Sequence, residues 1–114
     1  MMGCAGAFTP TKSPKACFTI TGQVANGTIA DGSVVQVRYG TGAAPANAAA
    51  VTGTQVGASQ TYTAKVAAQF DGFCIGGIVS GLSIGTAYWI DVALNSVTGG
   101  TLTVISLTIT ATEE

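Results

Sequence analysis

The segment TAYWIDVAL, residues 86–94, shows the pattern that decides the fold of this chain. Its apolar residues recur at every second position, as Tyr88, Ile90, Val92 and Leu94. Successive side chains of a strand point to opposite faces, so this spacing predicts a strand with one buried face. The segments KACFTITGQV (15–24) and SVVQVRY (33–39) alternate in the same way. The apolar residues of these segments therefore recur with a period of two, which is typical of β-structure.

The alternation recurs along most of the chain and predicts seven strands. Their expected ranges are 16–24, 33–39, 51–56, 59–67, 69–79, 86–94 and 101–111. The glycine pair Gly76-Gly77 leaves open a break in the fifth strand, which would give an eighth. Turn-forming pairs punctuate the strands, namely Asn26-Gly27, Asp31-Gly32, Asp71-Gly72 and Gly99-Gly100, the last as a hairpin turn between the final two strands. The pattern favours an all-β fold, an antiparallel β-sandwich or jelly roll of seven or eight strands.

The last predicted strand contains a change of phase. In TLTVISLTITAT (101–112), Leu102 and Val104 share one face, whereas Ile105 and the apolar residues after it follow the opposite phase. A shift of one residue would turn the apolar face away from the core unless an extra residue is looped out. We therefore expect a β-bulge or a change of sheet at Val104-Ile105.

The chain divides into two parts. Its 114 residues fit one domain, which we assign to residues 16–114. Residues 1–15 contain two prolines and two lysines and are expected to form an extended N-terminal arm outside the sandwich.

Charge is scarce, at 8% of residues, with four Lys/Arg against five Asp/Glu. This balance gives no electrostatic footprint for nucleic acid or for an anionic membrane. The apolar run FCIGGIVSGLSIGTAYWI (73–90) is broken by four glycines and by polar residues, so no transmembrane helix is expected. A surface with so few charges does little to repel its own copies, and we infer that much of it is buried in an assembly.

The sequence offers little for catalysis. It contains no histidine, and no two carboxylates are spaced as an acid–base pair. We therefore expect no enzyme activity, no catalytic residue, no cofactor and no metal site. Asp91, in the middle of a predicted strand, is interpreted as a satisfied polar group. The sequon Asn26-Gly27-Thr28 is interpreted as a turn.

Three cysteines, Cys4, Cys17 and Cys74, show no C-x-x-C pair. Their odd number, without a secretory signal, favours reduced thiols made in a cytoplasm. A bridge between Cys17 and Cys74 stays open. The neighbours Tyr88 and Trp89 are read in two ways. In the first interpretation, both rings form a platform on which sugars stack. In the second, which we favour, one ring packs in the core and the other covers a subunit contact.

Three stretches resemble a known module. RYGTGAAPAN (38–47), GTAYWIDVAL (85–94) and the threonine-rich terminal strand are similar to a β-sandwich module of the virion proteins of tailed bacteriophages, over residues 16–114. More loosely, the last two resemble trimeric jelly-roll heads of the complement and tumour-necrosis-factor kind. The resemblance implies a non-enzymatic capsid decoration (cement) protein, made in the bacterial host cytoplasm and located in the virion. The alternative is a head or tail fibre, or a receptor-binding knob that acts as an adhesion or carbohydrate-binding module.

The resemblance also implies the partners, namely further copies of the chain in a homotrimer and the major capsid protein or another virion protein. In this interpretation the arm contacts the shell, with Phe8 as an anchor and Lys12 and Lys15 facing an acidic surface. Tyr88 and Trp89 complete the set of candidate partner-binding residues.

Overall fold

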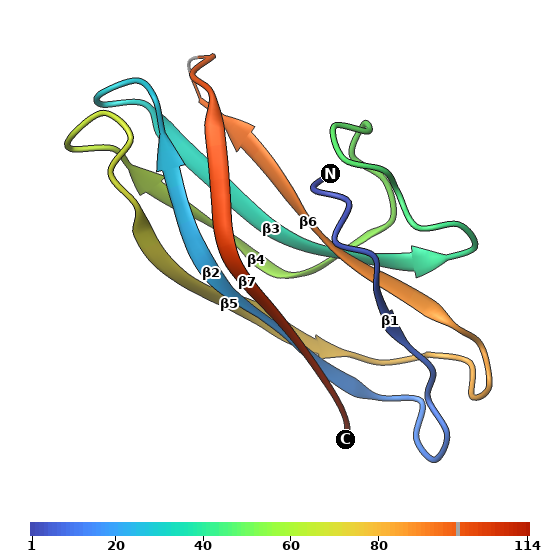
Figure 1. The fold of residues 1–114 in the computed structure, drawn as a ribbon. Helices are drawn as coiled ribbons and strands as arrows, with labels where there is room; N and C mark the ends of the chain where they lie inside the picture. Colours follow the sequence, from blue (N-terminus) through green and yellow to red (C-terminus); the bar gives the residue numbers. More distant parts are fainter. Residues whose placement is uncertain (98) are drawn as a thin grey trace.

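Seven strands arranged in two packed sheets make up the fold in the computed structural model, which describes residues 1–97 and 99–114 (Figure 1). The strands are β1 (Gly6–Phe8), β2 (Ala16–Asn26), β3 (Gly32–Thr41), β4 (Thr54–Thr63), β5 (Asp71–Val79), β6 (Tyr88–Ser96) and β7 (Leu102–Glu113). One sheet has the order β1-β6-β3-β4 and the other β5-β2-β7. All pairings are antiparallel. The predicted all-β sandwich is confirmed.

The core lies between the sheets and is built from the inward positions of the alternating strands. Its largest fully buried aliphatic and aromatic side chains are Phe18, Ile20, Ile90, Val24, Val35, Val37, Val56 and Val92. Aromatic rings extend it, because Phe18 packs edge-on against Phe8 and Tyr39. The described residues include no helix that is long and apolar enough to cross a membrane.

Most connections cross from one sheet to the other, and β3 and β4 are the consecutive strands that share a sheet. β6 and β7 lie in different sheets, so the predicted hairpin turn at Gly99-Gly100 is wrong. Glycines show that the chain turns but not which strand it then joins, and β7 pairs with β2 along almost its whole length. Asp71-Gly72 begins β5 instead of forming a turn, because Asp71 pairs with Val24.

The expected strands 51–56 and 59–67 are one strand, β4, with a bulge. Val35 pairs with Gln60 and Val37 with Val56, so β4 spans four residues where β3 spans two. Gly57, with a φ of 65°, lies in this bulge. A Cβ atom at Gly57 would collide with the carbonyl oxygen of Gly76 in β5. The glycines thus permit close approach of β4 to β5, and β5 runs through Gly76-Gly77 without the break that was left open.

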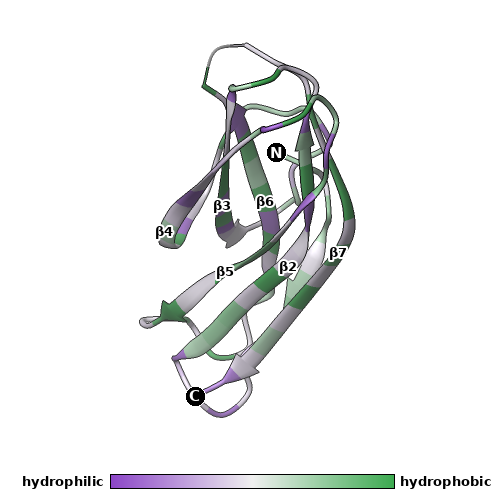
Figure 2. Cartoon of the chain, turned by 90° about the vertical axis from the view of Figure 1, so that its left-hand side faces the viewer, coloured by the Kyte–Doolittle hydropathy of each residue, from purple (hydrophilic) through white to green (hydrophobic). Residues whose placement is uncertain are grey.

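The predicted bulge in the last strand is confirmed. Thr21 pairs with Thr108 but Gln23 pairs with Ile105, so β7 holds one extra residue there. Ser106, with a φ of 57°, lies in this bulge, one residue beyond the predicted point. Figure 2 shows the alternation of apolar and polar residues along β7. The bulge brings Leu107 onto the face that Val104 occupies, and Ile105 is left 41% exposed.

Residues 1–14 do not lie outside the sandwich, which corrects the expectation of a free arm. Gly6, Ala7 and Phe8 pair with Ile90, Trp89 and Tyr88 at the edge of β6. Met1 and Pro10 are buried. The sequence segment lacks an alternating pattern long enough to predict a strand, but the edge of β6 offers unpaired backbone groups that a three-residue strand can satisfy.

Candidate functional site

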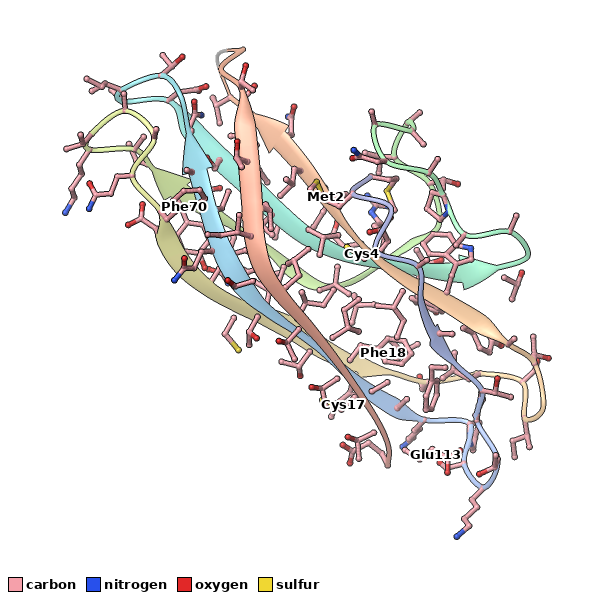
Figure 3. All side chains as sticks on the ribbon, in the orientation of Figure 1. Met2, Cys4, Cys17, Phe18, Phe70 and Glu113 are labelled. Carbon is pink, nitrogen blue, oxygen red and sulfur yellow. The ribbon has the colours of Figure 1, made fainter. Side chains whose placement is uncertain are left out.

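The predicted contact residues of the arm lie in two different environments. Phe8 packs against the core, with its ring centroid 5.4 Å from that of Phe18. Lys12 and Lys15 are exposed in the connection between β1 and β2. The carboxylate of Glu113 accepts hydrogen bonds from the backbone N–H groups of Thr11 and Lys12, and these bonds lower the pKa of Glu113. The arm is therefore held at the end of the sandwich where the chain also ends, as Glu113 in Figure 3 shows.

Tyr88 and Trp89 are both buried, at 8% and 6% exposure. Tyr88 belongs to the core, as we expected of one of the pair, and its hydroxyl accepts a hydrogen bond from the backbone N–H of Ser83 at 2.8 Å. Trp89 lies on the opposite face of β6, where Met1 and Ala93 cover it, and its indole N–H donates to the carbonyl of Thr41 at 3.2 Å. Neither ring is exposed as a sugar-stacking platform needs.

Asp91 is fully buried on the same outer face of β6. Oδ1 accepts hydrogen bonds from the N–H groups of Cys4 and Val92, at 3.0 and 2.7 Å, and Oδ2 accepts one from Gly3 at 2.9 Å. The interpretation of Asp91 as a satisfied polar group is confirmed. Its carboxylate fixes the N-terminal segment and has no free oxygen directed at solvent.

The three cysteines are unbridged. Cys17 pairs with Ile78, and Cys74 with Thr21, so the two cysteines are offset by four residues along their strands. At about 3.3 Å per residue this offset is about 13 Å, which exceeds the reach of a disulfide of about 7 Å between Cα atoms. Burial, together with the nearby Asp91 carboxylate, raises the pKa of the Cys4 thiol to about 11. Cys4 is therefore a weak nucleophile at neutral pH.

The acidic and sulfur-bearing side chains do not gather into a metal site. Among residues 1–97 and 99–114, no group of three or more His, Cys, Asp or Glu side chains is placed to hold a metal ion.

Three loops meet at the end of the sandwich remote from Lys12 and Lys15 (Figure 1), and their described residues are 27–31, 64–70, 97 and 99–101. Four of the eight large hydrophobic side chains that are exposed among the described residues lie on them: Ile29 (60%), Val66 (58%), Phe70 (40%) and Val97 (60%). We call these four residues the apolar tip. Phe70 marks its position in Figure 3. Among the described residues of these three loops, Lys65 is the charged residue whose side chain is exposed.

Buried polar groups hold the three loops together. The Asn26 amide donates to Oδ2 of Asp31 at 2.9 Å, and the N–H of Gly100 donates to the same oxygen at 2.9 Å. Backbone bonds between Ala30 and Ala64, at 2.8 Å, and between Ala68 and Asn26, at 2.9 Å, tie the first loop to the second. The three loops that carry the apolar tip are thus bonded to one another.

The same network settles the interpretation of the sequon. Asn26 is 1% exposed, and its Oδ1 accepts a hydrogen bond from the N–H of Thr28 at 2.9 Å. The predicted turn is confirmed, because the Asn26 amide is buried inside it.

The outer face of the β5-β2-β7 sheet forms a second surface. Its central rows pair Thr19 with Thr110 and Thr21 with Thr108. The other described residues on this face are also uncharged: Cys17, Gln23, Cys74, Ile78, Ile105 and Thr112. We call this surface the threonine face.

Sequence reasoning missed the apolar tip. Ile29 lies between two turn-forming pairs, Asn26-Gly27 and Asp31-Gly32, where an exposed branched apolar residue is unusual, and this was the available signal.

Comparison with protein-family models, with curated proteins and with solved structures gave no match. The candidate site therefore rests on the geometry of the chain itself.

Proposed function

We propose that this protein is a non-enzymatic structural component of a bacteriophage virion, a capsid decoration protein that binds the head lattice as an oligomer and stabilises it. The proposal is supported by the resemblance of residues 16–114 to a virion module and by the scarcity of charge. The observation that carries it is the braced apolar tip, a surface of four hydrophobic side chains on a rigid sandwich. The homotrimer stays a prediction of the resemblance.

The polarity of the molecule gives the proposed orientation. The charged residues Lys12, Lys15, Glu113 and Glu114 lie around the end opposite to the apolar tip. Covering apolar side chains with a partner lowers the free energy of the complex, whereas covering exposed charges removes their hydration and raises it. We therefore place the tip against the major capsid protein and the charged end toward solvent, in place of the shell contact of Phe8, Lys12 and Lys15 that the resemblance implies. Several copies on one lattice strengthen each other's attachment through effective concentration, and their binding stabilises the bound form of the shell.

A binding assay with a matched pair of variants tests this proposal. Ile29→Glu places a charge on the tip, and Ile84→Glu places the same charge on an isoleucine that is 55% exposed in the connection before β6, at the other end. With purified heads assembled without this protein, we expect Ile29→Glu to weaken binding about tenfold or more. Ile84→Glu should bind as the wild-type protein does.

Three outcomes contradict parts of the proposal. A wild-type protein that does not sediment with heads contradicts the decoration function. Equal binding of both variants moves the contact away from the tip. Binding to host cells in place of heads favours the adhesion alternative.

A further inference from the structure

β7 is a long edge strand with one neighbour. Ten of its twelve residues pair with β2, and no second strand adds to its other side among the described residues. An edge of this kind presents a row of unpaired N–H and C=O groups, which is a template for another strand. Natural proteins protect such edges with short strands, charges, prolines or covering segments.

The other three edges of the sandwich are protected. β1 is three residues long. β4 and β5 approach each other so closely that a Cβ atom at Gly57 would collide with the carbonyl oxygen of Gly76. Over residues 102–112, β7 contains no charged residue and no proline, and the protective device that it carries is the β-bulge at Ser106. Beyond this bulge, the pairing of β7 with β2 is regular from Thr108 to Glu113.

We propose that a second copy of this chain binds at this edge, so that the two β7 strands pair antiparallel around a two-fold axis. The inference goes beyond the proposed function, and it specifies a two-fold contact where the resemblance implies a threefold one. The two three-stranded sheets would become one six-stranded sheet, in the order β5-β2-β7 followed by β7-β2-β5 of the partner. A two-fold contact is self-complementary, because each copy offers the same edge.

The side-chain pattern of β7 fits its own copy. A two-fold axis perpendicular to the sheet keeps the outer faces of both copies on one side. Thr108, Thr110 and Thr112 then meet the partner's threonines, in pairs that are favourable across antiparallel strands. On the other side, Leu107 and Ile109 are half-buried, and the second copy would cover more of their apolar surface. Residues 102–112 of this edge carry no charge that would select a partner of opposite charge. A second copy of the same strand, in contrast, matches it on both faces of the sheet.

The test compares the same substitution on two neighbouring strands. Thr110 lies on the edge strand and Thr19 lies directly opposite it on β2, so both are on the threonine face. Thr110→Lys brings two like charges together across the two-fold contact, and Thr19→Lys adds the same charge one strand further in. Sedimentation velocity of the full chain measures the oligomeric state, and circular dichroism confirms that each variant is folded.

We expect a wild-type dimer, a dimer of Thr19→Lys, and a dissociation constant about tenfold higher or more for Thr110→Lys. Mixing Thr110→Lys with Thr110→Glu should restore dimers. A wild-type protein that is a monomer or a trimer at all concentrations overturns the inference, as does an equal effect of Thr19→Lys. If Thr110→Lys does not fold, the pair Thr108→Lys and Thr108→Glu answers the same question. Because no capsid is present, the result is independent of the proposed function.

Discussion

The Asp91 carboxylate is buried on the outer face of β6, and the first residues of the chain fold over it. Three backbone N–H groups, of Gly3, Cys4 and Val92, donate to its two oxygens. Gly3 and Ala5 have positive φ values, 69° and 52°, so the backbone bends sharply to bring these donors to the carboxylate. One side chain thus decides where an otherwise irregular segment lies.

Replacing this carboxylate should destabilise the protein. Asp91→Asn keeps the shape but directs an NH₂ group at backbone N–H donors, so at least one donor loses its partner. An unsatisfied buried donor costs about 1–3 kcal/mol, and we expect the free energy of unfolding to fall by about 2–4 kcal/mol. Urea denaturation monitored by circular dichroism measures the change.

Asp71→Asn is the matched control, because it removes the same charge from a residue at the start of β5 that is only half-buried. It should change the free energy of unfolding by less than about 0.5 kcal/mol. If Asp91→Asn unfolds at the same urea concentration as this control, the carboxylate does not hold the segment.

β7 shows how one residue sets the face of an entire strand. Before Ser106, Leu102 and Val104 point inward, and after it Leu107 and Ile109 do so. Without the extra residue, one of these two groups would turn outward, because side chains alternate with a period of two. The bulge is therefore a requirement of the sequence.

Deletion of Ser106 should therefore lower the free energy of unfolding more than any substitution at this position does. It forces either Leu102 and Val104 or the residues after the bulge out of the core, a loss of about 2–4 kcal/mol by the apolar area involved. Ser106→Gly keeps the bulge and accepts the φ of 57°, so its stability should stay within about 1 kcal/mol of wild type. Thermal unfolding of both variants checks this, and equal midpoints would contradict the assigned role.

The strands could be predicted where alternation is local. Tyr88 to Leu94 and the change of phase before Leu107 are properties of neighbouring residues, and both were read correctly. The partner of each strand is a long-range property, so Gly99-Gly100 was wrongly read as a hairpin. The same holds for β4, which the predicted ranges 51–56 and 59–67 divide in two, whereas Gly57 between them permits close approach to Gly76.

The whole molecule measures 45 × 23 × 20 Å, with the apolar tip at one end of its strands and Lys12, Lys15 and Glu113 near the other. The candidate site could not be predicted, because its members lie on three loops that the sequence separates by more than 25 residues each. The same reason applies to Phe8, which the resemblance implies as an anchor, and to Trp89, one of the two neighbouring aromatics, because folding covers both with distant parts of the chain. Exposure is decided by the assembled fold.

Removal of residues 1–14 tests how the whole molecule depends on the N-terminal segment. The free-arm interpretation expected the sandwich to stay folded. In the structure, the truncation also takes away β1, the packing of Met1 over Trp89 and two of the N–H donors to Asp91. We expect the emission of the single tryptophan to shift to longer wavelength and the unfolding midpoint in urea to fall markedly. The double variant Lys12→Ser/Lys15→Ser keeps the backbone and should keep wild-type emission. Unchanged emission in the truncated protein would show that the segment is dispensable.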